Sequence, residues 1–250
     1  DLASISTSAI LTDGYYHING SKIWTSEADK ADWMYCLVRT NKSAKKQAGI
    51  SFVLIDLNQS NIEIKPIELL SGHSPFCQVF LDGVIAREKH RIADENDGWK
   101  VAKRLLQYER TMMADLGSEG AIDINPFKTF TESRGADYSC NKALYRKLVH
   151  HTMRSHMIDI TMSRVGDESR AGFSQASLTL KYLSTEEIQQ RWELNVASLG
   201  LGGLETVRKS KGERKEIAKS FFYSKAYTIA GGSSEVQLNI IAKNILGLSS

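Results

Sequence analysis

The chain has 250 residues, of which 42% are hydrophobic and 24% charged, and its formal net charge at pH 7 is +3. This length and composition are typical of an ordinary globular protein with one large domain or two modest ones. The small net charge argues against nucleic-acid binding, no apolar run is long enough to cross a membrane, and three widely spaced cysteines indicate a reducing compartment.

The first part of the chain carries the pattern of short β-strands. Asn19-Gly20 is the strongest hairpin signal, and Asp13-Gly14, Asn58–Asn61 and Asp82-Gly83 are further predicted turns. Strands of this length and spacing predict a small antiparallel β-sandwich or barrel. The predicted strands are Tyr15–Ile18, Lys22–Trp24, Trp33–Val38, Ile50–Ile55, Ile62–Ile67 and Val79–Leu81.

After Asp94 the hydrophobic period becomes helical and remains so. The first predicted helix, Gly98–Leu116, follows the N-cap candidates Asn96 and Asp97, and Pro126 marks a break. Strands followed by helices predict an α+β chain, with the β-sandwich or barrel in residues 1–93 and an up-down four-helix bundle in residues 94–250. The later helices are predicted at Tyr138–Val165, Phe173–Val196, Glu213–Tyr227 and, after Gly231-Gly232, Val236–Leu246.

Glu109 is the first candidate for a catalytic group. It lies three or four residues from Leu105, Leu106, Met112 and Met113 on the predicted helix, so its carboxylate stands beside apolar neighbours. One interpretation is a boundary glutamate paired with Arg110 or a lysine, and the helix alone favours it. The other is a catalytic base that removes a proton from a substrate.

Two further stretches have the composition of binding sites. Trp24-Thr25-Ser26 ends a predicted strand, where an aromatic ring and two hydroxyls can stack on a planar ring and donate hydrogen bonds to it. The alternative is a strand end with a buried aromatic. In Ala230–Glu235, two glycines before a helix can present backbone N–H groups to an anion or carbonyl, and the alternative is a turn with a serine cap.

The histidines do not predict a metal site. His151 and His156 are five residues apart on one predicted helix, and no cysteine or second histidine cluster complements them. Together with His150, they are expected to be solvated or to lie at the boundary of the core.

Taken in order, these stretches resemble the acyl-CoA dehydrogenase family over nearly the whole chain. Asp13–Thr40 resembles its middle β-domain, Asn96–Thr111 the first helix of its C-terminal domain, and Ala226–Leu248 its C-terminal signature. The resemblance implies an FAD-dependent enzyme that oxidises an acyl-CoA thioester to the trans-2-enoyl-CoA, in the cytoplasm or the mitochondrial matrix. The family's N-terminal helical domain would precede Asp1, so residues 1–93 are interpreted as a truncated middle domain, and this chain by itself is expected to bind FAD poorly.

The resemblance also assigns residues. Trp24 and Ser26 match positions that touch the flavin, with Thr25 between them. Ser233 and Glu235 match positions of the signature that contact the cofactor.

The position of the catalytic base also follows from the resemblance. Many relatives carry the glutamate at the position of Gly231, and a smaller set carries it at the position of Glu109. Because Gly231 has no side chain, the resemblance implies that Glu109 is the base, while the Gly231 N–H hydrogen-bonds the thioester carbonyl.

The implied partners are an acyl-CoA substrate, an electron-transfer flavoprotein as electron acceptor, and further subunits bound through the helical domain in a homo- or hetero-oligomer. Arg134-Gly135-Ala136 lacks the Phe-Gly that follows an FAD-binding arginine in many relatives. One alternative is therefore a non-catalytic subunit that completes a partner's flavin site. Another is an acyl-CoA oxidase-like flavoenzyme, in which oxygen reoxidises the flavin.

Overall fold

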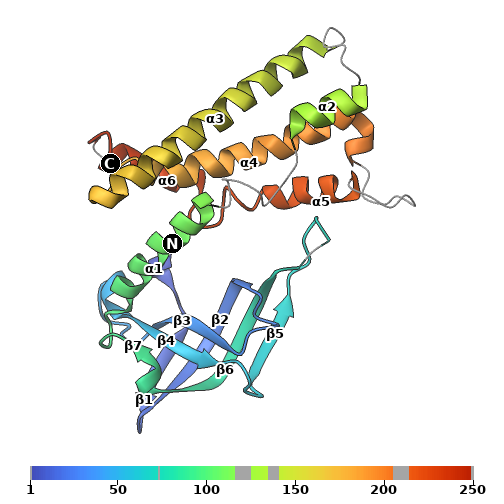
Figure 1. Cartoon of the computed structure of the whole chain (residues 1–250). Coiled ribbons are helices and arrows are strands. Elements are labelled where there is room, and N and C mark those ends of the chain that lie inside the picture. Colours follow the sequence, from blue (N-terminus) through green and yellow to red (C-terminus); the bar gives the residue numbers. More distant parts are fainter. Residues whose placement is uncertain (1, 73, 116–124, 135–140, 205–213, 249–250) are drawn as a thin grey trace. The chain divides into compact units, whose positions relative to one another are not determined.

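The computed structural model describes residues 2–72, 74–115, 125–134, 141–204 and 214–248 (Figure 1). The chain forms two compact units, Asp1–Gln107 and Tyr108–Ser250, each described by itself below. The first unit contains the strands, and helix α1 (Gly98–Asp115) begins in it and ends in the second, which contains the other helices. This is the predicted α+β class.

The described strands form one seven-stranded sheet in the order β5-β6-β2-β1-β3-β4-β7. Neighbouring strands are antiparallel, except that β1 runs parallel to β3 where Ser8 pairs with Arg39. The sheet is therefore mixed, and one parallel pair distinguishes it from the expected antiparallel arrangement. The strands are β1 (Ser8–Thr12), β2 (Tyr15–Ser26), β3 (Trp33–Arg39), β4 (Ile50–Asp56), β5 (Ile62–Pro66), β6 (Phe76–Arg87) and β7 (Arg91–Ile92).

The first hairpin is at Asp13-Gly14, and the predicted hairpin at Asn19-Gly20 is wrong. Asp13 and Gly14 have φ of +48° and +79°, the left-handed pair that a tight two-residue hairpin turn requires, and they join β1 to β2. Strand β2 continues through Asn19-Gly20 because both flanking segments pair with β6. Gly20 is required there for close packing, since a Cβ atom would lie 2.8 Å from the Cα of Thr7.

The predicted turn at Asp82-Gly83 is also wrong. It is a β-bulge in β6, opposite Asn19: the register shifts between Ile18 and Gly20, and the side-chain oxygen of Asn19 accepts a 2.7 Å hydrogen bond from the Gly83 N–H. Gly83 has φ of +63°. A bulge and a hairpin turn both use left-handed residues, so the dipeptides alone do not distinguish them.

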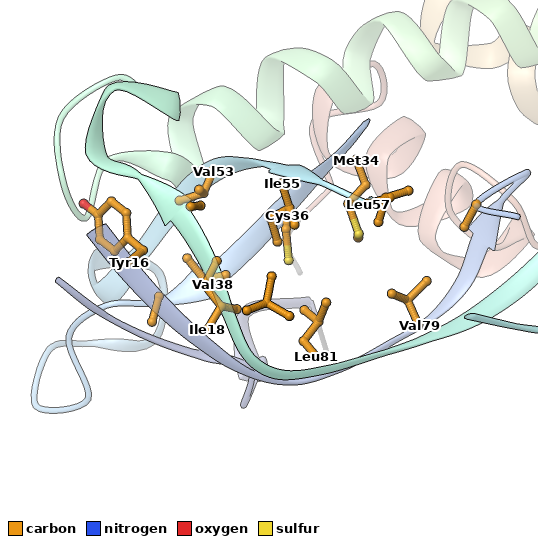
Figure 2. Packing of buried hydrophobic residues seen from close by; sticks show 14 of the residues in the cluster. Tyr16, Ile18, Met34, Cys36, Val38, Val53, Ile55, Leu57, Val79 and Leu81 are labelled. Atoms are coloured by element: carbon orange, nitrogen blue, oxygen red, sulfur yellow. The ribbon is translucent and has the colours of Figure 1, made fainter. Parts of the chain in front are cut away.

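The core of the first unit lies between the β2–β6 part of the sheet and the β3–β4 part (Figure 2). Alternate residues are buried in β3 and at the start of β2, as a pleated strand with one face toward the core requires. The side chains from the two parts lie in one buried cluster, so the sheet folds over itself in the manner of a small barrel. Its members include Tyr16, Ile18, Met34, Cys36, Val38, Val53, Ile55, Leu57, Val79 and Leu81.

The second unit is organised around α4 (Ser177–Leu199), which contacts α2 (Pro126–Arg134), α3 (Lys142–Ala171), α5 (Arg214–Ser224) and α6 (Ser234–Asn244) (Figure 1). One core cluster joins α2 and α3 to α4 around Phe130, and a second joins α4 to α5 around Trp192. No described helix is long and apolar enough to span a bilayer.

Helix α2 was not expected. Pro126, which we interpreted as a break, is its first residue, where the missing proline N–H costs no hydrogen bond. Asn125 caps this helix by accepting the N–H of Phe127 at 2.9 Å. Leu116, Tyr138 and Glu213, at the ends of other predicted helices, lie outside the described residues.

A buried polar cluster joins α3 to α4, and it corrects the expectation for His151. That side chain is 4% exposed, with Nε2 3.4 Å from the carboxylate of Glu187, which also accepts hydrogen bonds from Ser155 and Arg191. Burial lowers the pKa of His151, and the Glu187 charge opposes that shift. His151 is therefore a neutral core residue at pH 7, whereas His150 and His156 are exposed as expected.

The start of α1 is attached to strand β4 by a ring of three hydrogen bonds. The Asn96 N–H donates to Ser51 Oγ at 2.8 Å, Ser51 and Thr40 share a 2.7 Å bond, and Thr40 donates to the Asn96 side chain at 2.8 Å. Gly98 then passes against the β4 backbone, because a Cβ atom on it would lie 2.4 Å from Phe52 N. The helix that carries Glu109 therefore begins at a defined place on the sheet.

Candidate active site

Glu109 is half-buried on α1 and lies within electrostatic reach of Lys181 on α4. Burial lowers the pKa of Lys181, and the carboxylates of Glu186 and Glu109 oppose that shift. The Glu109 carboxylate is therefore one of two negative charges that act on the Lys181 ammonium. Within the described residues Glu109 forms no direct ion pair, and the Arg110 side chain lies outside them.

The Gly231-Gly232 turn precedes α6, and both glycines have left-handed backbone, with φ of +67° and +102°. Its carbonyls face the protein interior: Gln237 Nε2 donates to Gly231 O at 3.1 Å, and Lys181 Nζ donates to Gly232 O at 2.6 Å. In the described part of the chain, the Gly231 N–H makes no hydrogen bond. This donor is therefore free to bind a substrate carbonyl.

Trp24 stands in a β-bulge near the end of β2, where the register shifts between Lys22 and Thr25. Its backbone is left-handed, with φ of +63°, which is a strained conformation for an aromatic residue. The ring is 57% exposed and contacts the edge of Phe76, with ring centroids 6.0 Å apart. The alternative of a buried aromatic is therefore wrong, and a bulge that turns an aromatic ring outward fits a stacking site for a planar cofactor.

The other predicted cofactor residues lie next to these two features. Thr25 and Ser26 continue β2, half-buried and exposed respectively, and pair with Cys77 and Phe76 of β6. Ser233 is the N-cap of α6, and its hydroxyl holds the pKa of the exposed Glu235 below its ordinary value. The end of β2 and the start of α6 thus each present hydroxyl groups.

The predicted site residues fall into two groups. Glu109 and Gly231 both lie near Lys181 in the second unit, with Ser233 and Glu235 next to the glycine turn, whereas Trp24, Thr25 and Ser26 lie in the first unit. No group of described His, Cys, Asp and Glu side chains is arranged to hold a metal ion. A surface pocket of about 430 Å³ beside Tyr15, Trp33 and His90 contains none of these residues in its lining.

Sequence reasoning missed Lys181. Its position carries a signal, because Lys181, Thr185, Ile188 and Trp192 follow a spacing of four, three and four residues, which is one face of a helix. All of these side chains are at most 3% exposed. A lysine in register with Ile188 and Trp192 therefore indicates a buried amine that must find hydrogen-bond partners.

Comparison with known proteins matches the chain to two family models. Residues 1–84 match the acyl-CoA dehydrogenase middle domain, and residues 96–246 match the acyl-CoA dehydrogenase C-terminal domain. The chain is 29% identical over 264 residues to acyl-CoA dehydrogenase IpdE1 of Mycolicibacterium smegmatis, with 99% of the chain and 64% of that protein aligned. It is 31% identical over 251 residues to FadE34 of Mycobacterium tuberculosis, with 99% of the chain and 33% of that protein aligned.

Solved structures show the same fold. The Tcur3481–Tcur3483 steroid ACAD aligns with a TM-score of 0.87 at 23% identity, covering all of this chain and 65% of that one. The ChsE4–ChsE5 complex of Mycobacterium tuberculosis aligns at 0.76 and 22% identity, covering all of this chain and 66% of that one. Since the two family models account for most of its residues, the chain belongs to the acyl-CoA dehydrogenase family.

Proposed function

We propose that this chain carries out the α,β-dehydrogenation of an acyl-CoA thioester with Glu109 as the α-proton base. The observation that supports the proposal is that Lys181 hydrogen-bonds the Gly231-Gly232 turn and also interacts electrostatically with Glu109, so that a carboxylate and an N–H without an acceptor in the described residues are linked through one lysine. A base and a carbonyl-binding donor are the two groups that removal of a proton next to a thioester requires.

Two residues of the chain have separate roles in the proposed reaction. The Gly231 N–H donates a hydrogen bond to the thioester oxygen, which makes the α-proton more acidic. Glu109 accepts that proton and keeps it on its carboxylate until product leaves. FAD, when bound, supplies the acceptor for the hydride that leaves the β-carbon.

The residues present fit a flavin. The exposed, strained Trp24 supplies a stacking face, and Thr25, Ser26 and Ser233 supply hydroxyl donors, with Glu235 beside Ser233. We propose these five residues as the chain's contribution to FAD binding, and residues 1–93 and 94–250 as the two domains. Cys36 and Cys77 are free and buried, which agrees with the proposed cytoplasmic or mitochondrial-matrix location.

The overall reaction is tested with the native holoprotein, purified with FAD and with whatever further domain or subunit it carries. Under anaerobic conditions, an acyl-CoA substrate is expected to bleach the flavin absorbance, and electron-transfer flavoprotein is expected to restore turnover. The test series contains short, branched, long and ring-bearing acyl-CoAs. The ring-bearing acyl-CoAs are included because one similar structure is described as a steroid ACAD. Failure of the whole series to reduce the flavin would contradict the proposal.

Two alternatives give different results in the same assay. An acyl-CoA oxidase-like enzyme is reoxidised rapidly by oxygen alone. A non-catalytic subunit that completes a partner's flavin site has no flavin when purified alone, and the description of ChsE4–ChsE5 as a complex motivates that comparison. Gly135 and Ala136, on which this alternative depends, lie outside the described residues.

A separate prediction concerns the residues proposed to bind FAD. Trp24→Ala and Ser26→Ala are each expected to weaken FAD retention, because a stacking face or a hydroxyl donor is lost; a stacked aromatic pair contributes about 0.5–1.5 kcal/mol, or roughly a 2- to 12-fold change in dissociation constant. The measurement is the dissociation constant of FAD after it has been removed and added back. Trp33→Ala is the matched control, since Trp33 is 49% exposed on the same sheet and packs against His90 instead. If both variants retain FAD as tightly as the parent, Trp24-Thr25-Ser26 is a strand end without a role in FAD binding.

A further inference from the structure

Lys181 is a lysine with only 2% of its side chain exposed, and its partners are backbone carbonyls. Its Nζ donates a 2.6 Å hydrogen bond to Gly232 O and lies 3.5 Å from Thr228 O. A buried ammonium is costly unless its protons are used in this way, so the contacts are not incidental. The two carbonyls flank Gly231 along the chain, and Lys181 therefore holds the segment on either side of that residue.

The glycine turn needs such support. Glycine has more backbone conformations open to it than any other residue, and two in succession make a turn that loosens easily. Gln237, which is 1% exposed, supplies a second donor to the same turn, with Nε2 3.1 Å from Gly231 O and 3.4 Å from Gly232 O. Lys181 and Gln237 together direct both carbonyls inward, and the Gly231 N–H remains without an acceptor in the described residues.

Helix α4 also holds the rest of this segment, by contacts of a different kind. Glu186 accepts the Ser234 hydroxyl at 2.6 Å, Gln189 accepts the Thr228 hydroxyl at 3.2 Å, and Glu193 pairs with Lys225 at 2.6 Å. These contacts attach the flanks of the turn. Lys181 attaches the glycine turn itself, and its positive charge also lies near Glu109.

We propose that Lys181 is a positioning residue for the dehydrogenation: its ammonium holds the Gly231-Gly232 turn so that the Gly231 N–H meets the thioester carbonyl. This inference rests on the proposed function. It adds a group that acts through the glycine turn and sets the geometry of one reacting contact. Misplacement of a reacting contact by an ångström lowers a rate by about a hundredfold.

The test is Lys181→Met in the native holoprotein, since methionine keeps most of the volume and loses the charge and the donor. The rate constant of anaerobic flavin reduction by acyl-CoA is expected to fall about 10- to 100-fold. The dissociation constant of the acyl-CoA is expected to change by less than about threefold, because most of its binding contacts remain. Amide hydrogen exchange, which does not depend on turnover, is expected to become faster in the peptide that contains Gly231.

Two further variants separate positioning from general destabilisation. Lys225→Met removes an exposed ion pair from the same segment and is expected to keep the parental rate. Lys181→Arg keeps the charge and the donor and is expected to recover part of the rate at a thermal stability similar to that of Lys181→Met. If Lys181→Met does not fold, Gln237→Met removes the other donor to the turn and is expected to show the same loss of rate with unchanged substrate affinity.

The outcomes distinguish the two proposals. If the parent holoprotein is not reduced by any acyl-CoA, the proposed function fails. If the parent is reduced and Lys181→Met or, in its place, Gln237→Met keeps the rate within a factor of about three, the role of this turn support is overturned while the proposed function stands. An arginine variant no faster than the methionine variant at equal stability also overturns it.

Discussion

Replacing Glu109 with glutamine is expected to lower the rate of flavin reduction by acyl-CoA about 100- to 10,000-fold, the usual contribution of a positioned general base. Glutamine has nearly the same size and cannot accept the α-proton, so substrate binding is expected to change little. Because Gly231 has no side chain, the described glycine turn offers no second carboxylate in place of Glu109. The measurement is single-turnover bleaching of the flavin in the native holoprotein, together with the dissociation constant of a substrate analogue.

The matched control is Glu132→Gln, which neutralises an exposed glutamate on α2. It is expected to reduce the flavin at the parental rate. A Glu109→Gln rate within a factor of about three of the parent would mean that the α-proton goes to another group. Activity lost together with substrate binding would instead point to a structural role for Glu109.

Gly98→Ala is expected to destabilise the protein by about 3 kcal/mol, the upper end of the range for over-packed sites. The added Cβ atom would lie 2.4 Å from Phe52 N and Ser51 C, and these are backbone atoms of β4 that cannot rotate away. The start of α1 must therefore move, which also disturbs the ring of hydrogen bonds through Asn96. Since Glu109 lies on the same helix, the rate of flavin reduction is expected to fall as well. Thermal unfolding of the holoprotein measures the first effect.

Gly166→Ala is expected to stabilise the protein, whereas Gly98→Ala is expected to destabilise it. Gly166 lies within α3, and a Cβ atom on it would have nothing within 4 Å. Alanine there lowers the entropy cost of forming the helix and is expected to add up to about 1 kcal/mol. If both alanines changed the unfolding temperature equally, the close approach of Gly98 to β4 would have no energetic consequence.

The strand region shows which features of the fold local sequence predicts and which it does not. The short apolar runs Trp33–Val38 and Ile50–Ile55 were sufficient to locate β3 and β4 to within a residue or two of their ends. The dipeptides Asn19-Gly20 and Asp82-Gly83 were predicted as turns, and they are parts of two long strands that pair with each other. Gly20 and Gly83 both have positive φ, but only pairing with a distant strand decides whether such a residue closes a hairpin or forms a bulge.

The candidate site likewise contains residues that the sequence indicated and contacts that it did not. The resemblance at Trp24, Glu109 and Gly231 was legible in the sequence, because each lies in a short stretch with its own composition. The contacts of Lys181 and His151 were not. Helical spacing places Lys181 on the buried face of α4, but its hydrogen-bond partners, like the partner of His151, lie more than thirty residues away in the chain, and no local pattern contains them.

The sequence by itself indicated that strands precede helices, showed the resemblance to a flavoenzyme family, and offered Glu109 as a candidate for the catalytic base. Hydrophobic period is a local property and is sufficient for the fold class, whereas the candidate base follows only from the resemblance. Only the tertiary structure decided that Trp24 faces outward from a strained bulge and that Lys181 supports the glycine turn. The physical reason is that hydrogen bonding and desolvation of a buried group depend on which distant segments pack against it.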